Sequence, residues 1–245
     1  MTSILCQQLC KTFEQGGSLI KGLDHVDLSI EPGEFVCLSG PSGSGKTTLL
    51  NALGGLDTPD QGEITIGDQR IDQLSKKQLA HLRLQKIGFV FQAFNLVPVL
   101  SARENVEFVM QLQGIDKAER RQRSDTILAE VGLAGLEQRR PAQLSGGQQQ
   151  RVAVARAIVS NPVLVLADEP TANLDSNSAS QLMDLFQQLN QKRGITFVIA
   201  THDQRVMSYC RRLIRMQDGR IVSDETQPGK IALQSEGVAP QEQAL

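Results

Sequence analysis

The feature that most constrains this chain is a glycine-rich segment between an apolar run and a helical pattern. Residues 35–38 are apolar, and residues 48–56 place leucines on one helical face. The intervening segment fits the pattern G-x-x-x-x-G-K-[S/T]; its residues are Gly40, Pro41, Ser42, Gly43, Ser44, Gly45, Lys46 and Thr47. Glycines in this strand–loop–helix context let successive backbone N–H groups face an anion. The segment predicts a phosphate-binding loop (P-loop) in preference to a plain glycine-rich turn.

The end of the P-loop also carries side-chain chemistry. The Lys46 ammonium can bridge the β- and γ-phosphates of a nucleoside triphosphate, and the Thr47 hydroxyl can ligate Mg²⁺. Because Thr48 opens the predicted helix, its N–H lies at a helix N-terminus that favours negative charge. We expect residues 40–48 to bind ATP.

Hydrophobic patterning predicts an α/β fold. Four apolar runs are continuous, as in parallel strands covered on both faces: residues 35–38, 87–91, 163–167 and 197–200. Residues 26–30 and 64–66 alternate apolar and polar side chains instead, which is typical of a half-buried antiparallel layer. Leucine spacing predicts helices after the first and third runs. We expect a P-loop NTPase core with a mainly parallel sheet and an N-terminal antiparallel β layer.

A helical subdomain is expected at about residues 93–160. No strand pattern occurs between residues 101 and 159. Ser101 with Glu104, and Asp116 with Glu119, fit the N-cap and N3 positions of helices.

An Asp-Gly turn at residues 218–219, between apolar segments, predicts a hairpin that closes the folded region. We therefore expect one nucleotide-binding domain over residues 1–226. The remaining residues, 227–245, are polar and predict a flexible tail.

Composition excludes several functions. Lys plus Arg is 25 and Asp plus Glu is 27, so the net charge of -2 lacks the basic field that nucleic-acid binding requires. Acidic residues also intersperse the basic run at 117–123, which favours a solvated helix face. No apolar stretch is long enough to span a bilayer, so a membrane role requires a partner. The four cysteines form no CxxC pair, and we expect them to be reduced in the cytosol.

Two adjacent carboxylates, Asp168 and Glu169, end the apolar run 163–167. Carboxylates at the carboxyl edge of a sheet can reach a ligand held there. Asp168 is the expected partner of Mg²⁺, and Glu169 can deprotonate the water that attacks the γ-phosphate. Alone, such a pair is more often a solvated or capping pair. The P-loop in the same chain favours the catalytic interpretation.

A second anion-binding helix start is predicted after Leu144. The free N–H groups of a helix N-terminus attract negative charge. The segment that would supply them is Ser145, Gly146, Gly147 and Gln148. An isolated Ser-Gly-Gly is weak on its own and is more often a plain N-cap.

Taken in order, these motifs resemble those of the ATP-binding cassette (ABC) ATPases. The P-loop resembles their Walker A motif, residues 144–148 their signature motif, and Asp168-Glu169 their Walker B motif with its catalytic glutamate. Further residues resemble the Q-loop glutamine, the D-loop aspartate, the switch histidine and the adenine-stacking aromatic of the A-loop; these are Gln92, Asp175, His202 and Phe13. Tyr is commoner than Phe at the last position.

The resemblance implies roles that the residues alone do not show. Gln92 would join Thr47 and Asp168 as a metal ligand, and His202 would contact the γ-phosphate. Two copies would sandwich two ATP molecules head to tail, so that the signature motif and Asp175 of one copy face the P-loop of the other. Residues 88–96 and 166–175 resemble one bacterial branch in particular, the lipoprotein-releasing and macrolide-efflux ATPases.

This branch implies an ATP-hydrolysing subunit that powers transmembrane permease subunits from the cytoplasmic face of a bacterial inner membrane. A regulator of a membrane complex without transport remains an alternative, as does a soluble DNA-repair or ribosome-associated ABC ATPase. The interval from Thr47 to Ser145 is too short for a long coiled coil, and only one cassette is present. Both observations disfavour a soluble DNA-repair or ribosome-associated ATPase. The apolar segment 92–100 is expected to dock the partner, unless it packs beneath the helical subdomain.

Overall fold

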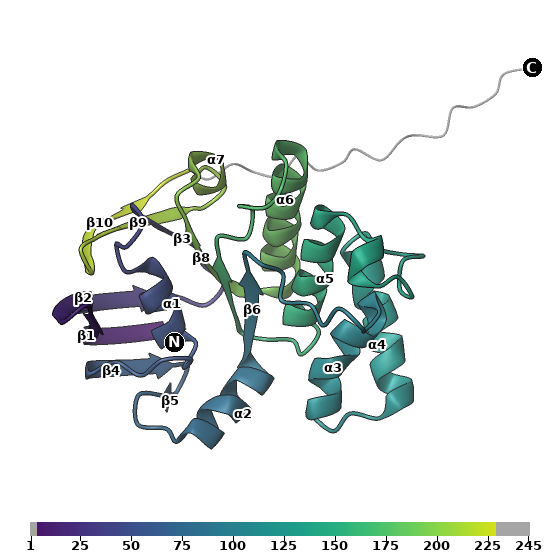
Figure 1. Cartoon of the computed structure of the whole chain (residues 1–245), viewed down its shortest axis with the longest axis horizontal. Helices are drawn as coiled ribbons and strands as arrows, with labels where there is room; N and C mark the ends of the chain where they lie inside the picture. Colours follow the sequence, from purple (N-terminus) through teal and green to yellow (C-terminus); the bar gives the residue numbers. More distant parts are fainter. Residues whose placement is uncertain (1–3, 229–245) are drawn as a thin grey trace, which may run out of the picture.

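The computed structural model describes residues 4–228, and its strands form two sheets (Figure 1). The antiparallel sheet has the order β2-β1-β4-β5 and consists of β1 (Ile4–Gln15), β2 (Ser18–Ile30), β4 (Gln61–Ile66) and β5 (Gln69–Arg70). The larger sheet has the order β10-β9-β3-β8-β7-β6 and consists of β3 (Phe35–Ser39), β6 (Ile87–Phe91), β7 (Leu164–Asp168), β8 (Thr196–Thr201), β9 (Arg212–Gln217) and β10 (Arg220–Thr226). Its strands are parallel except for the hairpin β9–β10.

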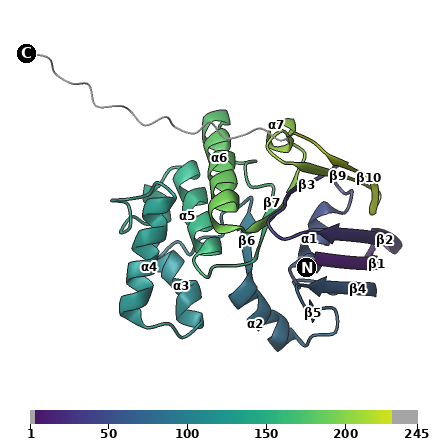
Figure 2. The same cartoon turned by 180° about the vertical axis from the view of Figure 1, so that it is seen from behind.

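The helices divide into two groups. Around the sheets lie α1 (Lys46–Leu53), α2 (Lys76–Lys86), α6 (Ser176–Arg193) and the short α7 (Gln204–Met207). The predicted helical subdomain contains α3 (Ala102–Leu112), α4 (Lys117–Glu130), a 3-10 turn at Pro141–Gln143 and α5 (Gly146–Ile158). Both views place α3 and α4 at the end of the molecule opposite the antiparallel sheet (Figures 1 and 2). Within residues 4–228, every helix is too short or too polar to cross a membrane.

The parallel strands are buried on both faces, as their continuous apolar runs predict. In β3, Val36 and Leu38 pack with α1 and the antiparallel sheet, whereas Phe35 and Cys37 pack with α5 and α6. The same alternation recurs in β7 and β8. Because both faces are covered, the edge formed by the carboxyl ends of these strands is the part left open to a ligand.

Two boundaries differ from the sequence-based expectation. Helix α1 begins at Lys46, inside the P-loop pattern, and ends at Leu53; Leu56 lies beyond it and is 47% exposed. Gln227, assigned by sequence to the flexible tail, is anchored: its N–H donates to the Arg211 carbonyl, and its side chain donates to the carbonyls of Met207 and Cys210. The rest of that predicted tail, residues 229–245, lies outside the described residues.

The two predicted helix caps behave differently. The Ser101 hydroxyl accepts the N–H of Glu104, whose carboxylate accepts the Ser101 N–H, which completes a capping box on α3. Asp116 occupies the N-cap position of α4, but its side chain makes no capping hydrogen bond. The sequence pattern alone does not separate the two cases.

We predict that Ser101→Ala lowers the free energy of unfolding by about 0.5–2 kcal/mol, the range measured for lost N-caps. Asp116→Ala is the matched control and should change it by less than about 0.5 kcal/mol, because no capping bond is lost. Urea denaturation measures both. Equal losses in the two variants would contradict the assignment of the caps.

Candidate functional site

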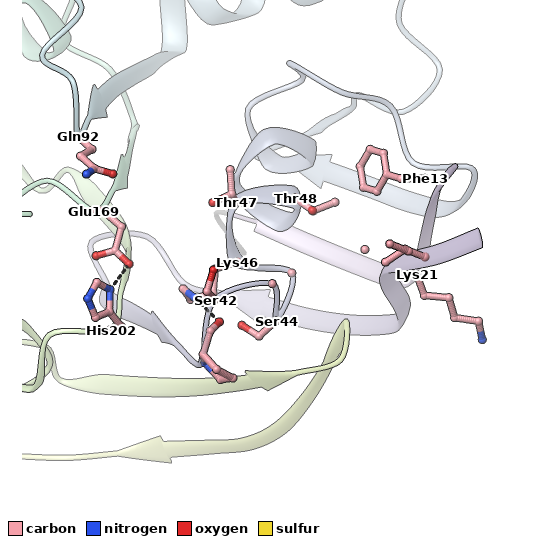
Figure 3. A pocket seen from close by; sticks show the side chains of 15 residues that line it. Phe13, Lys21, Ser42, Ser44, Lys46, Thr47, Thr48, Gln92, Glu169 and His202 are labelled. Atoms are coloured by element: carbon pink, nitrogen blue, oxygen red, sulfur yellow. Dashed lines mark hydrogen bonds and ion pairs between the residues drawn. The ribbon is translucent and has the colours of Figure 1, made fainter. Parts of the chain in front are cut away.

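Many of the predicted site residues line one cleft of about 620 Å³ at the carboxyl edge of the parallel sheet. Its lining consists of Phe13, Ile20, Lys21, Gly22, P-loop residues 41–48, Gln92, Glu169 and His202. Figure 3 shows Phe13 and Lys21 on one side of the P-loop and Gln92, Glu169 and His202 on the other. The cleft therefore has two ends, one formed by β1 and β2 and one formed by the ends of β6, β7 and β8.

Glycine is required at two P-loop positions for steric reasons. A Cβ at Gly40 would lie 2.2 Å from the carbonyl oxygen of Met216, and one at Gly45 would lie 2.4 Å from that of Gly22. Both glycines have positive φ, 149° and 102°. Any side chain would therefore strain the loop and push it off its neighbours.

The P-loop also has the features of an anion site. Helix α1 begins with no side-chain cap on its N-terminus, which leaves backbone N–H groups free for a ligand. Within residues 4–228 the buried Ser44 hydroxyl has no hydrogen-bond partner, which is costly unless a ligand supplies one. The Lys46 ammonium is held at the loop by the carbonyls of Gly40, at 2.8 Å, and Pro41, at 2.9 Å. These features fit a bound phosphate.

Hard oxygen ligands gather beside the P-loop. The Thr47 hydroxyl donates to Oδ2 of Asp168 at 3.0 Å. Burial raises the pKa of the Asp168 carboxyl, although the Thr47 bond opposes the shift, and the neighbouring Glu169 charge raises it further. Oxygen ligands beside a phosphate site suit Mg²⁺, whose charge would offset the cost of burying the carboxylate.

Glu169 is held in a strained backbone conformation. Its φ is 46°, which is uncommon for a residue other than glycine. Its N–H donates to the Ala200 carbonyl at 2.9 Å. Its carboxylate accepts the Thr201 hydroxyl at 3.0 Å, and its other oxygen lies 2.7 Å from Nδ1 of His202. These contacts fix the direction in which the carboxylate points into the cleft.

The signature segment and Asp175 lie outside this cleft. Ser145 and Gln148 form a capping box at the start of α5. The Asp175 carboxylate caps α6 by accepting N–H groups of Asn177 and Ser178. In one chain, the structure thus brings together Phe13, the P-loop, Gln92, the Walker B residues and His202, but not the second predicted anion site.

A separate group of metal-type ligands, Cys10, Asp24 and His25, lies on β1 and β2. Hydrogen bonds from Lys21, Arg220 and His25 hold the pKa of the Asp24 carboxyl well below its usual range. The carboxylate is thus already neutralised by two cationic side chains. This group does not need a metal ion for charge balance.

Comparison with known proteins identifies the fold. The model of the ABC transporter family matches residues 23–172. The chain belongs to the ABC transporter family. It is an ABC-type ATPase, and both the predicted fold class and the predicted enzyme class are confirmed.

Relatives include the macrolide export ATP-binding/permease protein MacB of Hyphomonas neptunium, which is 44% identical over 218 residues. The match covers 89% of this chain but 34% of MacB, so the chain spans about a third of that relative. An ABC transporter ATP-binding protein of Methanocaldococcus jannaschii is 44% identical over 228 residues, with 91% of this chain and 96% of the relative covered. The MacB relatives confirm the resemblance to the macrolide-efflux branch.

Solved structures of ABC proteins have a fold similar to that of this chain. The ATP-binding cassette of the same archaeal protein, a dimer in a post-hydrolysis state bound to ADP and Pi, has a TM-score of 0.85 and 42% identity over 93% of this chain and 100% of its own. The protein cbiO1 of Clostridium perfringens, part of an ABC transporter complex, has a TM-score of 0.82 and 31% identity over 92% of this chain and 88% of its own.

Sequence reasoning missed several residues of the ABC ATPase cleft. Ile20, Lys21 and Gly22 line it, and Thr201 orients Glu169. A Cβ at Gly22 would lie 2.5 Å from a ring carbon of Phe13, so the glycine makes room for the ring. A glycine inside a strand is a signal of such close approach. Nothing in the sequence pattern marks Thr201.

Phe13 lies at the open end of the cleft and is 41% exposed, unlike a core residue. The Lys11 ammonium is 5.7 Å from its ring centroid. Lys11 is in turn held by Asp57 at 3.0 Å and Asp60 at 3.4 Å. A flat ring supported in this way can stack on a purine base.

We predict that Phe13→Ala weakens ATP binding by about 0.5–1.5 kcal/mol, the scale of an aromatic stacking contact. GTP should be affected equally, because stacking reads the ring face of a base. Phe13→Tyr is the matched control and should retain affinity. Calorimetric titration measures these values; unaltered affinity with a lowered melting temperature would mean that Phe13 only packs.

Proposed function

We propose that this chain is the ATP-hydrolysing subunit of a membrane ABC transporter and that it works as a head-to-tail dimer. The observation that carries the proposal is the division of the site. The P-loop cleft holds a complete set of groups for one side of ATP, whereas the N-terminus of α5, the second anion site, lies elsewhere on the chain. A second copy would bring its Ser145, Gly146, Gly147, Gln148 and Asp175 to that ATP. The dimeric relative bound to ADP and Pi supports this arrangement.

In the proposed mechanism, the P-loop amides and Lys46 bind the phosphates. Thr47, Gln92 and Asp168 would hold Mg²⁺, and when bound this ion would offset negative charge on the phosphates. Glu169 accepts a proton from water as the water oxygen bonds to the γ-phosphorus and the bond to the ADP oxygen breaks. Thr201 and His202 keep the Glu169 carboxylate oriented through the contacts described above.

We predict that Glu169→Gln slows ATP hydrolysis at least about 10²-fold while ATP binding stays within about twofold, because shape is kept and the base is removed. The variant should accumulate as an ATP-dependent dimer in size-exclusion chromatography. Glu225→Gln, on the exposed strand β10, is the control and should turn over normally. Unchanged turnover of Glu169→Gln would exclude this residue as the base.

The partner is proposed to be a pair of transmembrane permease subunits at the cytoplasmic face of a bacterial inner membrane. Beside the segment that carries Gln92, the structure has an apolar groove of about 370 Å³. Its lining consists of Leu56, Ala80, Arg83, Leu84, Ile87, Gly88, Phe89, Phe91, Val109, Arg156, Ala157 and Ser160. A helix of a permease would bury an apolar face there. The name of MacB, which includes a permease, supports this class of partner.

Only part of the expected docking segment 92–100 is exposed and free to contact a partner. Leu96 packs against the core on the helical side, and the Phe94 carbonyl accepts a bond from Arg156 at 3.0 Å. Val99 is 69% exposed, whereas Val97 is 36% exposed. Substituting Leu96 would therefore test packing as well as docking. Leu56 and Val99 give cleaner tests.

We predict that Leu56→Asp and Val99→Asp leave the subunit folded and able to bind ATP but abolish co-purification with permease subunits from solubilised membranes, because a carboxylate buried in the interface is costly. Leu19→Asp is the control, since Leu19 is 78% exposed on the β1–β2 hairpin. Retained binding by both the groove variant Leu56→Asp and the docking-segment variant Val99→Asp would place the partner elsewhere. A transport assay on the assembled complex would distinguish a transporter from a regulator that does not transport.

A further inference from the structure

Helix α5 carries a wholly buried amide that the proposed mechanism does not use. Gln150 lies two residues after the signature segment, and its side chain is 0% exposed. Its Nε2 donates to the carbonyl oxygens of Pro170, at 2.6 Å, and Phe91, at 3.2 Å. Its Oε1 has no hydrogen-bond partner among the described residues.

Both acceptors adjoin residues of the proposed site. Phe91 is the last residue of β6 and precedes Gln92, whereas Pro170 follows Glu169. Phe91 pairs with Asp168 at the last position of the β6–β7 ladder, and beyond this pair the two segments of the chain leave the sheet. The carbonyls of Phe91 and Pro170 therefore need hydrogen-bond donors from outside the ladder. The single amide of Gln150, on α5, donates to both.

The two hydrogen bonds donated by the Gln150 amide nitrogen stabilise the fold, whereas its unpartnered oxygen costs free energy, so the two effects oppose each other in the free energy of unfolding. The amide also fixes the positions of two chain segments, the one that follows Phe91 and the one that follows Glu169. Glu169, with its φ of 46°, is held on its N-terminal side by the Ala200 carbonyl and on its C-terminal side through Pro170. A strained residue persists only when its surroundings fix it from both sides.

We propose that Gln150 is a positioning residue that fixes Gln92 and Glu169 relative to the signature helix. A displacement of α5 is then transmitted to both residues through one side chain. The Asn173 amide reinforces the link by donating to the Gln92 carbonyl at 3.0 Å. The inference rests on the proposed roles of Glu169 and Gln92.

The test compares ATP binding with turnover in the full-length chain. Gln150→Met keeps the size of the side chain and removes the donor. Its kcat should fall about 10- to 100-fold, the scale of a misplacement of about 1 Å, while the Kd for ATP stays within about twofold. Val152→Ala, a buried residue on the same helix, is the stability control: its melting temperature should fall while its kcat stays within about twofold of the unmodified protein.

Two further variants separate positioning from packing. Gln150→Glu should recover part of the lost kcat, because a carboxyl buried between two carbonyls stays protonated and keeps one donor. In the Glu169→Gln background, Gln150→Met should cause a smaller fold loss of kcat than in the unmodified protein, because one of the two residues it positions has already lost its function. An unchanged kcat in Gln150→Met, an equal loss in Val152→Ala, or full additivity with Glu169→Gln would each overturn the proposal. Normal turnover of Glu169→Gln by itself would instead overturn the site assignment.

Discussion

The rest of the molecule depends on one constraint, the close approach of three backbone segments: the P-loop, β9 and β2. The α-carbons of Gly40 and Gly45 face the carbonyls of Met216 and Gly22, at distances that no side chain tolerates. The loop is therefore clamped between β9 of the parallel sheet and β2 of the antiparallel sheet. This clamp makes the two sheets one unit, and it sets where the start of α1 presents its N–H groups.

The parallel sheet supplies the other half of the site. Strands β6, β7 and β8 end side by side, and each continues into one of the residues that face the P-loop: Gln92, Glu169 and His202. None of the three is close to the others in sequence. The sheet register brings them together, and local bonds from Thr201 and Gln150 then orient what the register has placed.

Patterns that depend on neighbours in sequence were predictable. The central strands β3, β6, β7 and β8 contain continuous apolar runs because both faces are covered, and the P-loop and the Ser101 cap are local motifs. Contacts between distant residues were not predictable, since no period or spacing marks the bond from Gln150 to Pro170 or the support of Phe13 by Lys11. The exposure of Leu56 was missed because helical periodicity continues past the point where Gly54 and Gly55 end α1.

The division of the site between two edges of the chain affects how the enzyme behaves at low concentration. If hydrolysis needs the signature helix of a second copy, a dilute subunit is inactive, and the total rate of ATP hydrolysis rises with the square of the subunit concentration. A permease that docks two copies, as proposed above, would remove this dependence, because two tethered copies meet at an effective concentration set by the assembly rather than by the cell. In the proposed assembly, the geometry of one loop and one helix start would therefore make ATP consumption depend on the partner that uses it.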